Sequence, residues 1–193
     1  MDLVTWIASD LRAIRSRFER GIVSLVEPSM WKVSAGSTEQ PSSSIAFLLL
    51  HMSYHHDLAI QTAVQNHAPL MTQRRSGLGL DGFAPHAGLE EREDRALTSA
   101  LDLEALNDYA ATVWDATADW LGRVATMAFD TIPDAGWRIE HLAGVTKNAV
   151  PWLHAMWTGQ TVGWFAQWEA IGHGYIHLGE MTAVRNQLGL SPF

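Results

Sequence analysis

The sequence predicts an all-α protein, a four-helix bundle with long connections, and three observations lead to this fold class. Four long segments carry apolar residues every three to four positions, which places those residues on one face of a helix. No strand pattern competes with these segments. The chain has 193 residues, of which 47% are hydrophobic and 18% charged, so it is long enough to bury one core. We therefore expect a single domain over residues 1–193.

The first two helices are bounded by proline and serine residues. The first helix is expected from about Leu3 to Glu27, and Pro28 ends it because a proline ring clashes with the preceding helical turn. The second is expected from about Ser44 to Asn66. Its opening serines are suited to that place because a serine side chain can accept a hydrogen bond from the first N–H groups of a helix.

The last two helices follow two long connections. The third begins near an N-capping aspartate and carries apolar residues inward over 102–124. The fourth runs from about Thr161 to Leu188 and stops at a glycine, a residue that commonly ends helices. The connections cover residues 67–101 and 128–160, and the second of them is expected to hold a short helix around Trp152 to Trp157. Connections of this length permit crossovers between the helices.

Composition excludes several classes of function. The formal net charge is −8, whereas binding to nucleic acid needs clustered Lys and Arg. No apolar run approaches the roughly 20 residues that span a bilayer, and the N-terminal residues do not resemble a secretory signal. We therefore expect a cytoplasmic protein that binds neither nucleic acid nor membrane. The chain has no cysteine, so a metal ligand must be histidine or carboxylate, and any reactive thiol must come from a cosubstrate.

One glycine motif is rejected. Gly77, Gly79 and Gly82 match the G-x-G-x-x-G spacing of dinucleotide-binding proteins. That motif requires a preceding strand and a following helix. Two arginines precede the segment and Pro85 follows it closely, so we interpret it as a loop.

Two histidines one helical turn apart predict a metal site in the fourth helix. At 100° per residue, His173 lies within about 40° of His177 on the core-facing stripe. Ala166 and Ala170 fall on the same stripe, and their small size predicts a cavity one turn from the pair. Glu180 lies about 60° to one side, where it is suited to orient a ligand or to become one.

The second helix supplies a third ligand. His51 lies at the centre of its apolar face, and His55, one turn further and about 40° off that centre, is the alternative. His56 and Asp57 point away from this face and are expected to be solvated. Three neutral imidazoles with an open position form the kind of site that holds catalytic zinc and related ions. A buried histidine alone is more often a hydrogen-bonded core residue, and His67, His86, His141 and His154 are interpreted as structural or exposed.

Aromatic residues lie on the opposite side of the fourth helix. Trp164, Trp168, Ile171 and Tyr175 share that side. An aromatic patch left in water is unusual, so it indicates either packing against the long connections or the interface of a homodimer. Trp152 and Trp157 are candidates to roof the pocket.

Two segments resemble the DinB-like (YfiT-like) superfamily of metal-binding four-helix bundles. The second helix is similar to that family's in SSIAFLLLHMSYHHD, and the last helix is similar in WFAQWEAIGHGYIHLGEMTAVRNQLGL. The resemblance implies a metal triad of His51, His173 and His177, a divalent ion such as zinc or nickel, and a homodimer. Some members of that family are similar to thiol-dependent transferases that use cosubstrates such as mycothiol or bacillithiol, so the resemblance implies this activity as a possibility for the chain.

Four hypotheses about function follow. The first is a metal-dependent transferase that joins a low-molecular-weight thiol to a small electrophile. The second is a metal-dependent hydrolase, with Glu180 or Asp57 as the base. The third is a non-catalytic protein that binds a metal or a small ligand. The fourth is a purely structural bundle that binds no metal.

Overall fold

The computed structural model describes residues 2–35 and 42–192, and the regular elements among these residues are helices, with no strand. This confirms the all-α class. Short 3-10 turns and small helices fill the connections. The elements in chain order are α1 (Leu3–Phe18), η1 (Glu19–Val23), η2 (Pro28–Met30), α2 (Ile45–Asp57), η3 (Leu58–Val64), α3 (Met71–Arg74), α4 (Arg95–Ala100), α5 (Leu103–Leu121), η4 (Thr126–Asp130), α6 (Ala135–Ala143), α7 (Pro151–Trp157), α8 (Val162–Phe165), η5 (Ala166–Gly172) and α9 (His173–Gln187).

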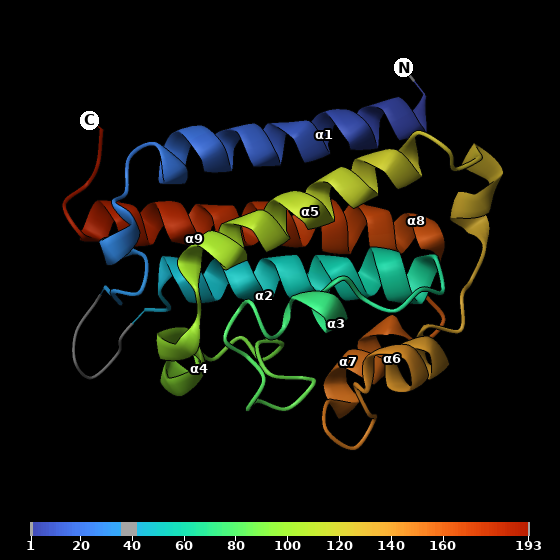
Figure 1. Ribbon diagram of the computed structural model, residues 1–193. Coiled ribbons are helices and arrows are strands. Elements are labelled where there is room, and N and C mark those ends of the chain that lie inside the picture. Colours follow the sequence, from blue (N-terminus) through green and yellow to red (C-terminus); the bar gives the residue numbers. More distant parts are fainter. Residues whose placement is uncertain (1, 36–41, 193) are drawn as a thin grey trace.

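Four long helical segments lie side by side, consistent with the predicted bundle (Figure 1). They are α1 with η1, α2 with η3, α5, and α8 through η5 into α9. The α2 helix packs against both α5 and α9, while α1 packs against the same two helices. Because α2 is also covered by the connection that holds α3 and α4, every residue of α2 is buried. This burial places the histidines of α2 in the interior.

Local capping sets the start of each predicted helix. The hydroxyl of Ser44 accepts from the N–H of Phe47 at 3.2 Å, and Asp102 and Thr161 cap α5 and α8 in the same way. At the other end, Gly189 has a φ of +78°, the left-handed conformation that glycine adopts without strain. The first helix ends at Val23, before the expected Glu27.

Three of the long segments contain a π-helical stretch, namely η1, η3 and η5. A π-helix closes its hydrogen bonds over five residues and therefore winds more slowly than an α-helix. Side chains on either side of such a stretch consequently lose the register that a constant 100° per residue predicts. The η5 stretch ends directly before His173, so it decides which neighbours share the face of that histidine.

The rejected glycine motif lies in turns between α3 and α4, as expected for a loop. The predicted short helix in the second connection is α7. Within the described ranges, no helix combines the length and the apolar character that crossing a membrane requires.

Candidate metal centre

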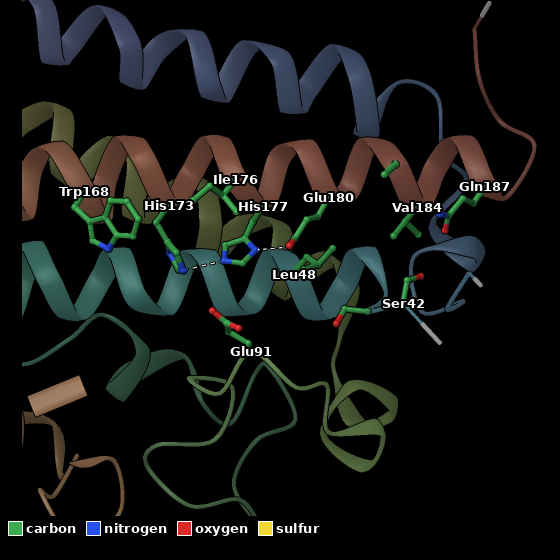
Figure 2. A pocket seen from close by; sticks show the side chains of 12 residues that line it. Ser42, Leu48, Glu91, Trp168, His173, Ile176, His177, Glu180, Val184 and Gln187 are labelled. Carbon is green, nitrogen blue, oxygen red and sulfur yellow. Dashed lines mark hydrogen bonds and ion pairs between the residues drawn. The ribbon is translucent and has the colours of Figure 1, made fainter. Parts of the chain in front are cut away.

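The first two turns of α9 present two imidazoles and a carboxylate in a row (Figure 2). Nδ1 of His177 donates to Oε2 of Glu180 at 2.7 Å. A carboxylate only accepts, so this bond fixes the proton of neutral His177 on Nδ1. Its Nε2 therefore carries a lone pair, and it lies 2.8 Å from Nε2 of His173. Glu180 is thus in the orienting position that its place in the sequence predicted.

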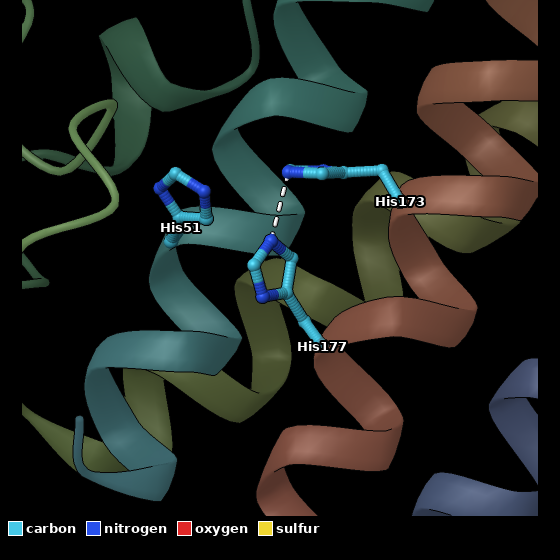
Figure 3. Close-up of side chains that lie close together, drawn as sticks. All are labelled: His51, His173 and His177. Carbon is cyan, nitrogen blue, oxygen red and sulfur yellow. Dashed lines mark hydrogen bonds between the residues drawn. The ribbon is translucent and has the colours of Figure 1, made fainter. Parts of the chain in front are cut away.

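His51 approaches this pair from α2 (Figure 3). The centroid of its ring lies 4.7 Å from that of His177 and 5.1 Å from that of His173. Its Nδ1 donates to the carbonyl oxygen of Gly88 at 2.8 Å, which leaves Nε2 as the free acceptor. That Nε2 is buried and has no hydrogen-bond partner in the part of the chain that the structure describes.

The three imidazoles fit a divalent ion. Each offers one ring nitrogen, and the three nitrogens lie within 4.8 Å of one another. A tetrahedral zinc ion with bonds of about 2.0 Å holds its nitrogen ligands about 3.3 Å apart, so small rotations bring the three rings into place. A lone pair buried without a donor is costly, and an ion at this position removes that cost for His51. The buried triad that the sequence selected could therefore hold a metal.

Burial keeps His51 and His173 in the neutral form that binds metals. It lowers the pKa of His51 to about 2, with smaller contributions from the charges of His55 and His177. The pKa of His173 is also held far below its usual value, first by burial and then by the neighbouring histidines. A neutral ring needs no deprotonation before an ion binds.

A cavity of about 510 Å³ opens beside His173 and His177 (Figure 2). Its apolar lining includes Leu48, Ile176 and Val184. Glu91, which is exposed, faces the histidines from the connection before α4. Sequence reasoning missed Glu91, because it lies in an irregular loop where no periodicity indicates direction.

The cavity does not lie over the two alanines, so that expectation was wrong. Ala166 and Ala170 are buried in the core and do not line it. The π-helical stretch η5 is the reason. At about 82° per residue in η5, Glu169 turns to within roughly 10° of His177, and Trp168 moves from about 180° to about 90° away. Trp168 accordingly lines the cavity, although the pattern had placed it on the opposite side.

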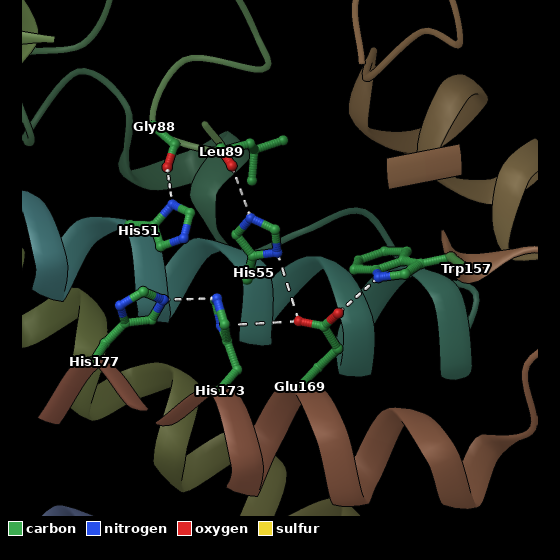
Figure 4. Close-up of polar contacts among 8 residues, drawn as sticks. All are labelled: His51, His55, Gly88, Leu89, Trp157, Glu169, His173 and His177. Atoms are coloured by element: carbon green, nitrogen blue, oxygen red, sulfur yellow. Dashed lines mark hydrogen bonds and ion pairs between the residues drawn. The ribbon is translucent and has the colours of Figure 1, made fainter. Parts of the chain in front are cut away.

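A second polar group adjoins the triad (Figure 4). His55 donates from Nε2 to the carbonyl oxygen of Leu89 at 3.0 Å, and its Nδ1 lies 3.5 Å from Oε2 of Glu169. Nδ1 of His173 lies 3.9 Å from the same oxygen. His55 thus groups with Glu169 and His173, and the structure gives no support to His55 as a substitute for His51. Glu169 was missed because of the register change in η5.

The prediction that His56 and Asp57 are solvated was wrong, because α2 is covered on all sides. Asp57 is fully buried, and its carboxylate accepts from the N–H groups of Leu70 and Met71 and from the hydroxyl of Tyr109. Burial raises its pKa to about 6, against the effect of these bonds. Such a carboxylate is unsuited to the role of an accessible base.

His56 faces α5, away from the triad. Its Nε2 lies 2.9 Å from the hydroxyl of Thr117. Burial lowers the pKa of His56 to about 3. The ring is buried and bonded, as in a structural core histidine.

The aromatic residues opposite the triad are largely covered within the chain. Ile171 is buried, and the guanidinium of Arg17 on α1 lies over the ring of Tyr175 at 5.4 Å. Trp164 packs against Phe165. The chain itself thus covers part of the patch, Trp164 and Tyr175 stay half-buried, and the homodimer stays a prediction.

The other aromatic residues and histidines that the sequence analysis named lie partly in the core and partly at the surface. Trp157 is buried and donates to Glu169, and the ring of Trp152 lies 5.9 Å from that of His55. Among the other histidines, His154 is buried and bonded to the carbonyl of Val145, while His67 and His141 are exposed.

Comparison with known proteins shows a shared fold. A scan against models of protein families and a search of curated proteins found no match. Among solved structures, the crystal structure of a conserved protein from Enterococcus faecalis is similar, with a TM-score of 0.65 and 18% sequence identity over 98% of this chain and 99% of that chain. At this identity, the likeness shows that the two proteins share an arrangement of helices over nearly their whole lengths.

Proposed function

We propose that the chain is a DinB-like protein that binds a divalent metal ion, zinc or nickel, through His51, His173 and His177. We further propose that it transfers a low-molecular-weight thiol to a small electrophile. The observation that carries the proposal is the convergence of ring nitrogens from two helices beside a cavity of about 510 Å³. When bound, such an ion supplies Lewis acidity that lowers the pKa of a thiol or water in its open position.

The side chains around the triad have separate tasks in this proposal. Glu180 and the carbonyl of Gly88 hold the Nδ1 protons of His177 and His51, so that Nε2 of each ring faces the ion. Leu48 and Ile176 cover the apolar part of a substrate in the cavity. The chain has no cysteine of its own, so the sulfur nucleophile arrives with the cosubstrate.

Glu91 is our candidate for the general base. Its carboxylate is exposed and lines the cavity with His173 and His177. It is therefore placed to accept the proton of an incoming nucleophile. We expect Glu91→Gln to lower kcat by roughly 10²- to 10⁴-fold, the range typical of general-base catalysis, with the metal content unchanged.

Hydrolysis is the second candidate, because the same carboxylate is equally suited to take a proton from water. The two reactions differ in whether the thiol is consumed. A panel of electrophiles incubated with mycothiol, bacillithiol or glutathione tests the transferase. Turnover of an ester or amide without loss of thiol would support the hydrolase instead.

Elemental analysis tests the metal site itself. We expect the purified His177→Ala variant to contain one equivalent of zinc or nickel less per chain than the purified wild-type protein. The exposed His141 provides a matched control, and His141→Ala should keep the full metal content. Equal metal content in wild type and His177→Ala would overturn the proposal.

A further inference from the structure

Three buried side-chain atoms meet next to the triad, and none of them forms a hydrogen bond within the described residues. They are Nδ1 of His55, Nδ1 of His173 and Oε2 of Glu169. The side chains of His55 and Glu169 are 3% and 1% exposed. A carboxylate oxygen at this depth is costly unless it is paired with a donor or a cation.

The hydrogen bonds at the far ends of these groups determine what faces inward. The carbonyl of Leu89 takes the Nε2 proton of His55, so a neutral His55 directs the lone pair of Nδ1 at Glu169. The indole N–H of Trp157 donates to Oε1 of Glu169 at 2.7 Å. This bond anchors the carboxylate and leaves Oε2 directed at the two rings (Figure 4). Nε2 of His177 accepts from Nε2 of His173, so the proton of His173 also lies on the far side of its ring. The arrangement therefore holds the three ligand atoms in place with no proton between them.

The distances favour a shared ion over direct hydrogen bonds. Oε2 of Glu169 lies 3.5 Å from Nδ1 of His55 and 3.9 Å from Nδ1 of His173. Hydrogen bonds between such atoms measure about 2.7–3.2 Å. Ligands of one zinc ion, with bonds of about 2.0–2.2 Å, lie roughly 3–4 Å apart. A small cavity of about 80 Å³ adjoins all three residues, which is enough room for an ion and a water.

We infer that His55, Glu169 and His173 form a second cation site, which holds a zinc-like divalent ion beside the one proposed at the triad. Two imidazole nitrogens and one carboxylate oxygen are a common zinc ligand set. His173 bridges the two ions, with Nε2 directed to the triad and Nδ1 to Glu169. Binding at both nitrogens releases the N–H proton of His173 to solvent.

Negative charge around the pair offsets the repulsion between two ions. Glu169 contributes one buried carboxylate. Glu91 lines both the small cavity and the large one, and Glu180 bonds to His177 on the other side. The inference rests on the proposed function only for its first ion, since the donors of the second site are arranged independently of His51 and His177.

Zinc stoichiometry tests the inference without an activity assay. The apo protein is titrated with Zn²⁺ and the bound metal is counted per chain in wild type, Glu169→Gln and His177→Ala. Glutamine keeps the acceptor for Trp157, so Glu169→Gln removes the charge with little change in shape. We expect two equivalents in wild type and one in each variant, and Glu140→Gln, at an exposed position of α6, should keep two.

Other outcomes separate the two proposals. One equivalent in both wild type and Glu169→Gln, with none in His177→Ala, would overturn the second site and leave the triad intact. One equivalent in wild type and His177→Ala, with none in Glu169→Gln, would support the second site and overturn the triad. If Glu169→Gln is poorly folded by circular dichroism, His55→Gln replaces it, with the same expected loss of one equivalent. A visible Co²⁺ spectrum with two resolved saturation steps provides an independent count.

Discussion

The α2 helix carries two pairs of buried polar side chains that differ in how they are satisfied. His56 and Asp57 contact α5 and the segment at α3, where hydroxyl and N–H groups bond to them. His51 and His55 face α9, and each uses one ring nitrogen for a backbone carbonyl while the other nitrogen has no partner in the described ranges. The two pairs are equally buried, but the protein supplies hydrogen-bond partners to the first pair and leaves one ring nitrogen of each histidine in the second pair without a partner in the part of the chain that the structure describes.

This contrast separates a structural role from a binding role. Buried polar groups are normally paired, because an unpaired one costs about 1–3 kcal/mol. On the side of α2 that faces α5, protein groups alone supply the hydrogen-bond partners of His56 and Asp57. The side that faces α9 meets this rule only when a cation or a proton enters. We therefore expect substitutions on the first side to change stability, and substitutions on the second to change metal binding.

The largest effect is expected for Asp57→Ala. The change leaves two N–H groups and the hydroxyl of Tyr109 without their acceptor. We expect a loss of about 3–5 kcal/mol in the free energy of unfolding, measured by urea denaturation. The exposed Asp108 serves as control, with a change within about 0.5 kcal/mol for Asp108→Ala. A loss of less than about 1 kcal/mol for Asp57→Ala would contradict the structural role.

Removal of the metal should lower the free energy of unfolding, because the histidines between α2 and α9 would lose the ion that satisfies their free ring nitrogens. An ion that binds only the folded state at 1,000 times its Kd adds about 4 kcal/mol to the free energy of unfolding. We expect a chelator to remove most of this in wild type, measured as a fall in Tm. In His51→Ala the triad ion is already lost, so the chelator should have a smaller effect, limited to the ion of the second site. An equal fall in both proteins would show that the stabilising ion binds elsewhere.

Acid should destabilise the folded state through His56. Its pKa is about 3 in the folded protein and 6.5 in an unfolded chain, so only the unfolded chain gains a proton as the pH falls below about 6.5. Stability that is present above that pH is therefore lost on acidification, by about 2 kcal/mol between pH 7 and pH 5. The variant His56→Leu should lack this part of the fall. Parallel curves of unfolding free energy against pH for the two proteins would contradict the assignment.

The sequence predicted those features that depend on local chemistry. Capping by Ser44 and Asp102 is a contact over three residues, so it is readable from the chain. His173 and His177 lie within one regular α-helix, where 100° per residue holds. Their facing direction was therefore predictable, and so was that of His51 in α2.

Features that depend on long-range packing were not predictable. The burial of His56 and Asp57 follows from α2 being covered by the connection between residues 65 and 102, which no helical pattern of α2 indicates. Glu169 and Trp168 changed face because η5 is wound as a π-helix. Glu91 reaches the cavity from an irregular loop.

The smallest expected effect is a fall in Zn²⁺ affinity on substitution of Glu180. This substitution tests whether the orientation of the His177 ring contributes to metal binding. The carboxylate of Glu180 holds the Nδ1 proton of His177, but the side chain is 51% exposed and therefore screened by water. In Glu180→Gln an amide oxygen still accepts this hydrogen bond, without the charge. We expect the affinity for Zn²⁺ to fall about tenfold, the low end for residues that orient a metal ligand. Competition with a chelating dye measures this fall, and Glu140→Gln should show none. If instead Glu180→Gln loses a full equivalent of zinc, Glu180 binds the ion directly and the tautomer of His177 is no longer fixed by that carboxylate.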